Sequence, residues 1–426
     1  MNYKVKPVNG PLHIVTEVPG SKSITNRALL MAAISKGKTK LTGVLFSDDS
    51  RAFLGCLKDL GFEVLIDEET KTVVIEGKGG AMPKSSATVF VGSAGTAARF
   101  ITAMLALSDG VYTITATEQM SKRPMKALFE ALMQMGAEFE YLGEEYHLPV
   151  RIKGNADAPR KVDIDISQST QFLSALLMIS PMLKNGLTID VVSEKKTGSY
   201  INITRRMMEE FGCKTEFNGQ SYIIEAGNAY ERPVYNIEPD MSAASYFYAM
   251  AAVTGGSAVV KNIFLNSMQG DLKFLGVLEK MGCTIKETAE GVELTGPEKL
   301  NGVDVDMNDF SDQTMTLAAI APYASSATTI RNIAHISLQE SDRLHGILNE
   351  LTRMGIECAE IDKGITINPG QPHSAVIETY EDHRMAMAFA ITGLKADGIE
   401  ISNPGCCRKT FENYFEVFEK AVHNGK

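Results

Sequence analysis

The chain has 426 residues, more than one hydrophobic core usually serves, so two domains are expected. Apolar residues make up 44% and charged residues 22%, which is typical of a globular protein. The formal net charge of −10 argues against a nucleic-acid binder, so any anionic ligand must be held by a local cluster of cations.

The six cysteines show neither metal-ligand spacing nor the density of a disulfide framework. We therefore expect free thiols in a reducing compartment. Residues 1–15 lack the apolar core of a secretory signal, and the apolar stretch 172–183 is too short to span a bilayer. These features predict a cytoplasmic protein with no membrane partner.

The first predicted helix begins in GSKSITNRALLMAA, residues 20–33, where hydroxyl and cationic side chains precede an apolar run. Five later segments have the same form, and they are 92–107, 167–180, 238–253, 308–324 and 380–394. The change from polar to apolar residues falls at Arg27, Arg99, Gln171, Ala244, Thr314 and Arg384. Successive changes are 70 to 73 residues apart, so six units of about 71 residues fill the chain.

A second helical pattern with apolar residues every three to four positions follows in five units, for example MKALFEALMQMGAEFE and RLHGILNELTRMGIECAE. Each ends at a glycine, which we expect at the C′ position in the left-handed conformation. Short strands follow, so each unit reads strand–helix–strand–helix–strands, an α/β pattern. The first helix of each unit is apolar on almost all sides, which predicts burial inside a domain.

The repeat divides three and three. The segment 228–240 contains proline and shows little periodicity, which predicts a seam between two domains. A second crossing is expected at 17–21, because the strand before this segment precedes the first repeated helix.

The polar helix starts are expected to favour phosphate and carboxylate, because helix N-termini carry partial positive charge and unpaired N–H groups. Hydroxyls and cations gather at Lys22, Ser23 and Arg27, at Ser169, Thr170 and Gln171, and at His383 and Arg384. Neighbouring loops add Lys122, Arg123, Glu340, Arg343, Arg408 and Lys409. A serine before a helix is usually only a cap, and a loop cation is usually solvated. The recurrence of the pattern nevertheless predicts one anion site between the two halves.

Carboxylates lie close to these cations in sequence at Asp312, Glu340 and Asp382. A carboxylate beside an anionic substrate can act as general acid or base when its pKa is tuned. The alternative is simple pairing with a neighbouring arginine, which we expect for Asp342 and Glu381. The chain has no GxxxxGK[ST] segment, so a kinase-type site is poorly supported.

Eight segments occur together, in order: PGSKSITNRALLMAA, GSAGTAARF, SKRPM, STQFLSALLM, DFSDQTMT, QESDRL, EDHRMAMAFA and KTFENYFE. With them the whole chain resembles the 5-enolpyruvylshikimate-3-phosphate synthase family of enolpyruvyl transferases. The resemblance implies two similar domains, each of three βαβαββ units with the helices buried inside, an inside-out α/β barrel type. It implies one domain over 21–239 and a second over 1–20 with 240–426, with the active site in the cleft between them.

The family transfers the enolpyruvyl group of phosphoenolpyruvate to the 5-hydroxyl of shikimate 3-phosphate and releases phosphate through a tetrahedral intermediate. The resemblance thus implies a transferase of the shikimate pathway, which leads to chorismate and the aromatic amino acids. It implies no metal or organic cofactor. We expect a monomer whose partners are the two small substrates.

The resemblance also implies site residues. Shikimate 3-phosphate would contact Lys22, Ser23, Arg27, Ser169, Thr170, Gln171, Thr197, Ser199, Tyr200, Asp312, His335 and Gln339. Which of Thr197 and Ser199 holds the phosphate stays open. Phosphoenolpyruvate would contact Lys22, Gly95, Arg123, Gln171, Arg343, Arg384 and Lys409. The catalytic groups would be Asp312 at the attacking hydroxyl, Glu340 at the methylene carbon, Lys22 and His383.

The chain departs from the family pattern at two positions. The family usually has lysine where this chain has Gln339, and often asparagine where it has His335. A missing cation should weaken the hold on a substrate anion or raise the pKa of Glu340. We therefore expect lysine in place of Gln339 to restore that charge, to lower the pKa of Glu340 and to move the acidic limb of the rate profile downward. The alternative is that His335 or Lys122 already occupies the space, so that the added lysine is repelled and activity falls.

Features of the sequence also bear on three other functions. The sister transferase acting on UDP-N-acetylglucosamine relies on a cysteine in the loop corresponding to 115–124, where this chain has none. An RNA 3′-phosphate cyclase is disfavoured by the acidic charge. A non-catalytic protein that binds phosphorylated ligands stays open until turnover is measured, although Asp312 and Glu340 favour an enzyme.

Overall fold

The computed structural model describes residues 2–425 and divides into two compact units. The N-terminal unit is Gly20–Ile237, and the C-terminal unit joins the residues up to Pro19 to those from Glu238 onward. The chain passes from one unit to the other at Pro19–Gly20 and at Ile237–Glu238. Both points fall within the segments that the sequence singles out as crossings, one and two residues before the expected boundaries.

The N-terminal unit contains three four-stranded sheets. Their strand orders are β14(Val234–Asn236)-β3(Lys36–Thr42)-β5(Thr72–Lys78)-β4(Val64–Asp67), β6(Ser86–Phe90)-β7(Val111–Thr115)-β9(Val150–Lys153)-β8(Glu138–Tyr141) and β10(Lys161–Ile164)-β11(Leu187–Val191)-β13(Ser221–Ile224)-β12(Glu216–Phe217). In each sheet the first pair is parallel and the other two pairs are antiparallel. The three sheets are therefore copies of one topology.

The C-terminal unit repeats this topology. Its sheets are β2(His13–Thr16)-β15(Ser257–Lys261)-β17(Gly291–Thr295)-β16(Thr284–Glu287), β18(Asp304–Asp306)-β19(Thr328–Arg331)-β21(Gly364–Ile367)-β20(Cys358–Ile361) and the three-stranded β22(Ala375–Ile377)-β23(Ile399–Ile401)-β1(Tyr3–Lys4). Each again begins with a parallel pair followed by antiparallel pairing. In the third sheet the N-terminal strand β1 supplies the antiparallel partner of β23.

Two strands lie in a different unit from the helix that follows them in sequence. Strand β2 comes just before the first helix of the N-terminal unit, yet it pairs with β15 of the C-terminal unit. Strand β14 precedes the first helix of the C-terminal unit, yet it pairs with β3 of the N-terminal unit. Each exchange completes a sheet that would otherwise lack its parallel edge strand.

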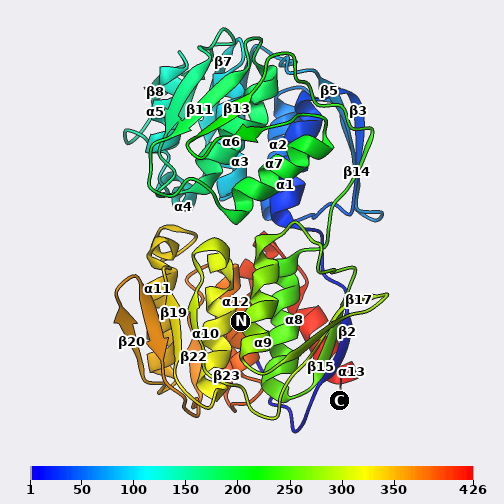
Figure 1. Cartoon of the computed structure of the whole chain (residues 1–426), viewed down its shortest axis with the longest axis vertical. Helices are drawn as coiled ribbons and strands as arrows, with labels where there is room; N and C mark the ends of the chain where they lie inside the picture. The colour runs from blue at the N-terminus through cyan, green and yellow to red at the C-terminus, as the bar shows by residue number, and fades with distance from the viewer. Residues whose placement is uncertain (1, 426) are drawn as a thin grey trace. The chain divides into compact units, whose positions relative to one another are not determined.

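One apolar helix of each repeat is buried. These helices are α1 (Lys22–Ile34), α3 (Gly95–Ala106) and α6 (Thr170–Ile179) in the N-terminal unit, and α8 (Met241–Thr254), α10 (Thr314–Ile320) and α12 (His383–Thr392) in the C-terminal unit (Figure 1). Within each unit the three pack against one another. Every residue of α3, α8, α10 and α12 is buried. The predicted six-fold repeat with buried helices is confirmed.

The second helix of each repeat buries one face only. These helices are α2 (Asp48–Asp59), α5 (Lys126–Gln134), α7 (Ser199–Glu210), α9 (Lys273–Lys280), α11 (Arg343–Arg353) and α13 (Tyr414–Asn424). The glycines after the first five, Gly61, Gly136, Gly212, Gly282 and Gly355, have φ between 77° and 104°, as expected for C′ residues.

Short helices occupy the connections. They are α4 (Glu118–Ser121), η1 (Ser180–Met182), η2 (Gly270–Leu272), η3 (Asn308–Gln313), η4 (Ala321–Tyr323), η5 (Ala334–Leu338) and η6 (Pro404–Lys409). No helix within residues 2–425 combines the length and the apolar character needed to cross a membrane. The six cysteines are free thiols, as expected, and burial raises the pKa of Cys56 to about 12.

Candidate active site

Arg343, the first residue of α11, is the centre of a buried charge cluster in the C-terminal unit. Its side chain is 1% exposed and contacts Asp312 Oδ1 at 3.0 Å, Glu340 Oε2 at 2.9 Å and Asp382 Oδ2 at 2.7 Å. Burial alone would lower the pKa of Arg343, but the three carboxylates raise it above its ordinary value. The guanidinium therefore keeps its charge at this buried position.

Asp382 has a structural role in this cluster. It is the N-cap of α12, accepting a hydrogen bond from Arg384 N at 2.9 Å and another from Ser341 Oγ at 3.0 Å. Burial would raise its pKa, but Arg343 holds the pKa below its ordinary value. Asp382 thus stays a carboxylate that fixes Arg343 and the start of α12.

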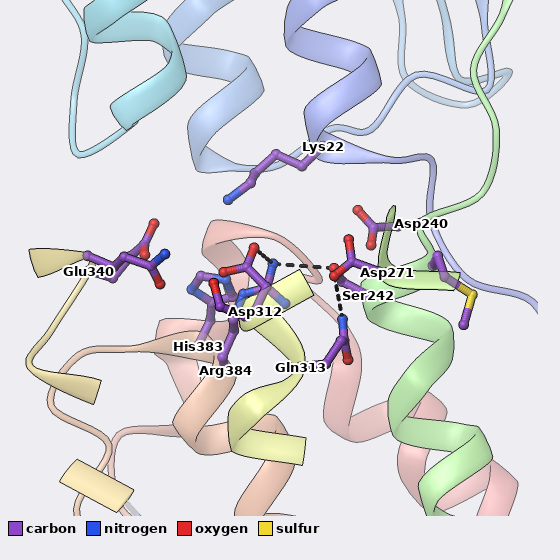
Figure 2. A network of polar contacts seen from close by, with 12 residues as sticks. Lys22, Asp240, Ser242, Asp271, Asp312, Gln313, Glu340, His383 and Arg384 are labelled. Carbon is purple, nitrogen blue, oxygen red and sulfur yellow. Dashed lines mark hydrogen bonds and ion pairs between the residues drawn. The ribbon is translucent and has the colours of Figure 1, made fainter. Parts of the chain in front are cut away.

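Asp312 lies between two guanidinium groups. Its Oδ1 faces Arg343, and its Oδ2 accepts from Arg384 Nη2 at 2.8 Å (Figure 2). Arg384 also donates to Ser242 Oγ at 3.4 Å. A carboxylate with a charged donor on each oxygen is held in one orientation.

Glu340 is the second carboxylate of the cluster that faces more than one cation. Besides Arg343, it has Lys409 Nζ at 4.0 Å from its Oε1. The buried ring of His383 lies nearby in the same unit, with Nδ1 3.6 Å from Asp382 Oδ1. The structure thus brings together Asp312, Glu340, Arg343, Arg384 and Lys409, as the sequence predicts.

Gln339 and His335 have partners within the protein. Gln339 Oε1 accepts a hydrogen bond from Arg343 Nη1, and His335 Nε2 lies 2.8 Å from Ser311 Oγ. Gln339 therefore adds a neutral acceptor where the family usually has a cation. With Gln339 included, five acceptor oxygens surround Arg343, which equals the number of N–H groups on its guanidinium.

Asp271, in η2, is a buried carboxyl that sequence reasoning missed. Its Oδ1 accepts from the buried Gln313 Nε2 at 3.0 Å (Figure 2). Burial and then the charge of Asp312 raise the pKa of Asp271 to about 6, although the Arg384 charge opposes this. Nothing in the local pattern marks Asp271, because its burial comes from packing against η3.

In the N-terminal unit, Arg27 of α1 is a buried cation whose hydrogen-bond partners are all neutral. It donates to Thr204 Oγ1 at 2.8 Å, to Ser23 O at 3.0 Å, and to Ser174 Oγ and Tyr200 O, both at 3.3 Å. Among residues 2–425 no carboxylate pairs with it, and burial lowers its pKa to about 10. Arg27 is still a cation at neutral pH, which suits an anionic ligand.

Lys22 opens α1 and lies 3.7 Å, Nζ to Oδ2, from Asp49 of α2. The two side chains are 15% and 3% exposed, so Lys22 is not a solvated loop lysine. The N-cap Ser21 makes no side-chain cap hydrogen bond, which leaves the first-turn N–H groups uncapped by that hydroxyl.

Gly95, the first residue of α3, lies against two guanidinium groups. A Cβ at this position would be 2.5 Å from Arg99 Nη1 and 2.7 Å from Arg123 Nη1. Arg99 donates to Gly95 O and Gln171 Oε1, both at 3.1 Å, and so ties α3 to the start of α6. Only glycine lets both arginines approach this helix start, and Arg99 is not among the candidate site residues predicted from the sequence.

The starts of α6 and α7 bring the remaining predicted residues together. Ser169 is the N-cap of α6 and accepts a hydrogen bond from Gln171 N at 3.2 Å. This is the ordinary capping role that a serine before a helix usually has. A Cβ on Gly198 would lie 3.5 Å from Thr170 Cγ2, which places Thr170 beside the segment holding Thr197 and Ser199. Tyr200 follows, with its ring centroid 5.9 Å from Arg27 Cζ.

Two units of three repeats, with cations at the starts of buried helices, define a six-repeat α/β protein. Among solved structures, EPSP synthase from Acinetobacter baumannii matches with a TM-score of 0.83 and 25% identity, covering 99% of this chain and 98% of that one. The 3-phosphoshikimate 1-carboxyvinyltransferases of Trichormus variabilis and Nostoc sp. are each 45% identical to it over 98% of this chain, and 98% and 99% of their own lengths are covered.

The family model for EPSP synthase (3-phosphoshikimate 1-carboxyvinyltransferase) matches residues 4–418. The chain belongs to the EPSP synthase family.

Replacing Asp271 by Asn should change how stability depends on pH. Because the folded-state pKa is about 6, above the ordinary 3.8, the ionised carboxylate costs the folded protein about 3 kcal/mol at pH 8. This cost disappears as the Asp271 carboxylate becomes protonated between pH 6 and pH 4. The melting temperature of the wild type should therefore rise relative to that of Asp271→Asn as the pH is lowered. Exposed Asp397→Asn is the control, and parallel melting curves for wild type and Asp271→Asn would contradict the assignment.

Proposed function

We propose that the two clusters described above carry out the enolpyruvyl transfer that the chain catalyses as a member of the EPSP synthase family. That reaction transfers the enolpyruvyl group of phosphoenolpyruvate to the 5-hydroxyl of shikimate 3-phosphate and releases phosphate, in the pathway to the aromatic amino acids. The observation that carries the proposal is the pair Asp312 and Glu340, fixed by Arg343 beside Arg384 and Lys409.

The chemistry needs two proton-handling groups and fixed cations. Protonation of the methylene carbon of phosphoenolpyruvate develops positive charge at the neighbouring carbon, which the 5-hydroxyl attacks as it loses its proton. Loss of phosphate and of a methyl proton then gives the product. We assign the methylene carbon to Glu340 and the hydroxyl to Asp312, whose orientation is fixed by two arginines. His383, buried beside Asp382, supports this cluster.

Phosphoenolpyruvate is assigned to Lys22, Gly95, Arg123, Gln171, Arg343, Arg384 and Lys409. Arg343 already faces five acceptor oxygens, so contact with this substrate requires it to release one of them. Gln339 is the neutral acceptor among them and costs least to release, since releasing a carboxylate would separate a buried ion pair.

Shikimate 3-phosphate is assigned to Lys22, Ser23, Arg27, Ser169, Thr170, Gln171, Tyr200, Asp312, His335 and Gln339, with Thr197 or Ser199 at the phosphate. The buried Arg27, paired only with neutral groups, supports an anion-binding role. We further propose that the enzyme acts as a cytoplasmic monomer.

The test is phosphate release from phosphoenolpyruvate with shikimate 3-phosphate as acceptor, compared with UDP-N-acetylglucosamine. Release with the first acceptor only is expected. Release with the second acceptor instead would indicate the sister transferase reaction, and binding without release would indicate a non-catalytic protein.

Lys22→Ala should reduce kcat/KM by at least about tenfold, or about 1.4 kcal/mol, because the cation proposed to touch both substrates is removed. The variant also leaves the buried Asp49 carboxylate without its cation, which should lower the melting temperature. Lys22→Ala combined with Asp49→Asn is the control, since it should recover stability but not activity. Recovery of activity in the double variant would show that Lys22 acts only by pairing with Asp49.

Gly95→Ala should raise the KM for phosphoenolpyruvate by roughly ten- to a hundredfold, because the new methyl group displaces Arg99 and Arg123. Steady-state kinetics with each substrate varied in turn measures this, and the KM for shikimate 3-phosphate should change less. Gly55→Ala in α2 is the matched control, because a Cβ there meets nothing within 4 Å. An unchanged KM in Gly95→Ala would remove Arg123 from the phosphoenolpyruvate site.

Gln339→Lys should lower kcat/KM by about tenfold, which is the alternative outcome of the sequence analysis and not the restored charge that it favoured. The substitution places a second cation beside the Arg343 guanidinium, which now contacts the neutral Gln339. Gln339→Met removes the acceptor without adding charge, so it should lose less activity. Higher activity in the lysine variant than in wild type would refute this reading of Gln339.

A further inference from the structure

The segment that leads into α12 contains two successive residues in the left-handed region. Tyr380 and Glu381 have φ of 53° and 56°, and neither is glycine. Side chains with a Cβ rarely adopt this conformation, so the surrounding structure must hold it. Asp382, His383 and Arg384 follow directly, so the conformation of the 378–382 turn sets where these three residues lie.

One face of α11 holds the 378–382 turn at three points. Arg343 Nε contacts Asp382 Oδ2 at 2.7 Å. One turn further along, Gly346 leaves space for the ring of Tyr380, since a Cβ there would lie 3.3 Å from Tyr380 Cε2. One turn beyond that, Glu350 Oε1 accepts from the Tyr380 hydroxyl at 2.8 Å. Positions three and four residues apart share one helix face, so α11 acts as a template for the turn.

Glu350 is a fully buried carboxylate whose partners come largely from the turn. Besides the Tyr380 hydroxyl, it accepts from Glu378 N at 3.1 Å, and it pairs with Arg353, which is 49% exposed. Burying a carboxylate is costly unless its oxygens are hydrogen-bonded. The turn therefore supplies two of the hydrogen bonds that Glu350 accepts, and Arg353 of α11 supplies the others.

The turn also connects to the proposed substrate site. Asp382 N donates to Thr379 O at 2.8 Å, which links the strained residues directly to the α12 cap. Arg384 lies two residues further on and contacts Asp312 Oδ2 at 2.8 Å. A displacement of Tyr380 would be passed to Asp382 and Arg384 because few single bonds separate them.

We propose that Glu350 and Tyr380 are positioning residues, which hold the 378–382 turn so that Asp382 and Arg384 stay in place against Arg343 and Asp312. The proposal rests on the proposed role of Arg384 in binding phosphoenolpyruvate. Neither residue touches substrate in this proposal.

The first test is Gly346→Ala. Alanine in a helix is more stable than glycine, so α11 itself should not be weakened. The added Cβ presses on the Tyr380 ring at 3.3–3.4 Å and also meets the flexible end of the Met385 side chain, at Cε, at 3.4 Å. We expect kcat/KM for phosphoenolpyruvate to fall by about fivefold or more, with a melting temperature that stays above the assay temperature. Gly276→Ala in α9 is the control, because a Cβ there meets nothing within 4 Å, and it should keep wild-type kinetics.

The second test is Tyr380→Phe, which removes only the hydroxyl bound by Glu350. A roughly tenfold fall in kcat/KM for phosphoenolpyruvate is expected, since the lost hydrogen bond is to a charged group. Tyr323→Phe is the matched control, because its hydroxyl donates to Thr392 O, at the far end of α12, at 2.7 Å. Equal activity losses in the two tyrosine variants would show that the loss comes from general destabilisation of the protein, and would overturn the proposal.

Arg384→Lys distinguishes an error in the positioning role from an error in the proposed role of Arg384. If it impairs phosphoenolpyruvate kinetics while Gly346→Ala and Tyr380→Phe do not, the positioning role is wrong and the proposed site stands. If Gly346→Ala and Tyr380→Phe impair the kinetics while Arg384→Lys does not, the assignment of Arg384 is wrong and the turn acts through Asp382. If none of the three has an effect, both proposals fail.

Discussion

The buried guanidinium of Arg343 is the group on which the rest of the C-terminal site depends. It joins Asp312 from η3, Glu340 from the preceding loop and Asp382 from the cap of α12. Removing any one carboxylate would leave charge uncompensated in the protein interior, which is strongly destabilising. The same contacts fix the two carboxylates proposed for proton transfer, so folding and chemistry use one set of ion pairs.

The repeat explains how residues far apart in sequence meet. Within the C-terminal unit, Arg384 of α12 contacts both Ser242 at the start of α8 and Asp312 just before α10. Within the N-terminal unit, Asn26 of α1 donates to Thr96 of α3 at 2.6 Å, and Arg99 of α3 donates to Gln171 of α6. Equivalent helices begin at equivalent places, so their polar first turns gather at one end of each unit.

The two units use this arrangement differently. In the C-terminal unit the cations are matched by carboxylates, which suits proton transfer beside a bound anion. In the N-terminal unit Arg27 is held by hydroxyls, carbonyls and aromatic rings, which leaves its charge available to a ligand. A common fold thus places cations matched by carboxylates in one copy and a cation held by neutral groups in the other.

The sequence by itself determined the six-fold repeat, the buried helices and the residues at their starts, because these depend on local patterns of apolar, polar and glycine residues. The helix starts at Lys22, Gly95, Thr170 and His383 were visible in this way. Only the tertiary structure decided that β2 pairs with β15 and β14 with β3, that Gln339 faces Arg343, and that Asp271 and Glu350 are buried. Such facts arise from contacts between segments distant in sequence, and a lone carboxylate on a surface and one in the interior look the same in the chain.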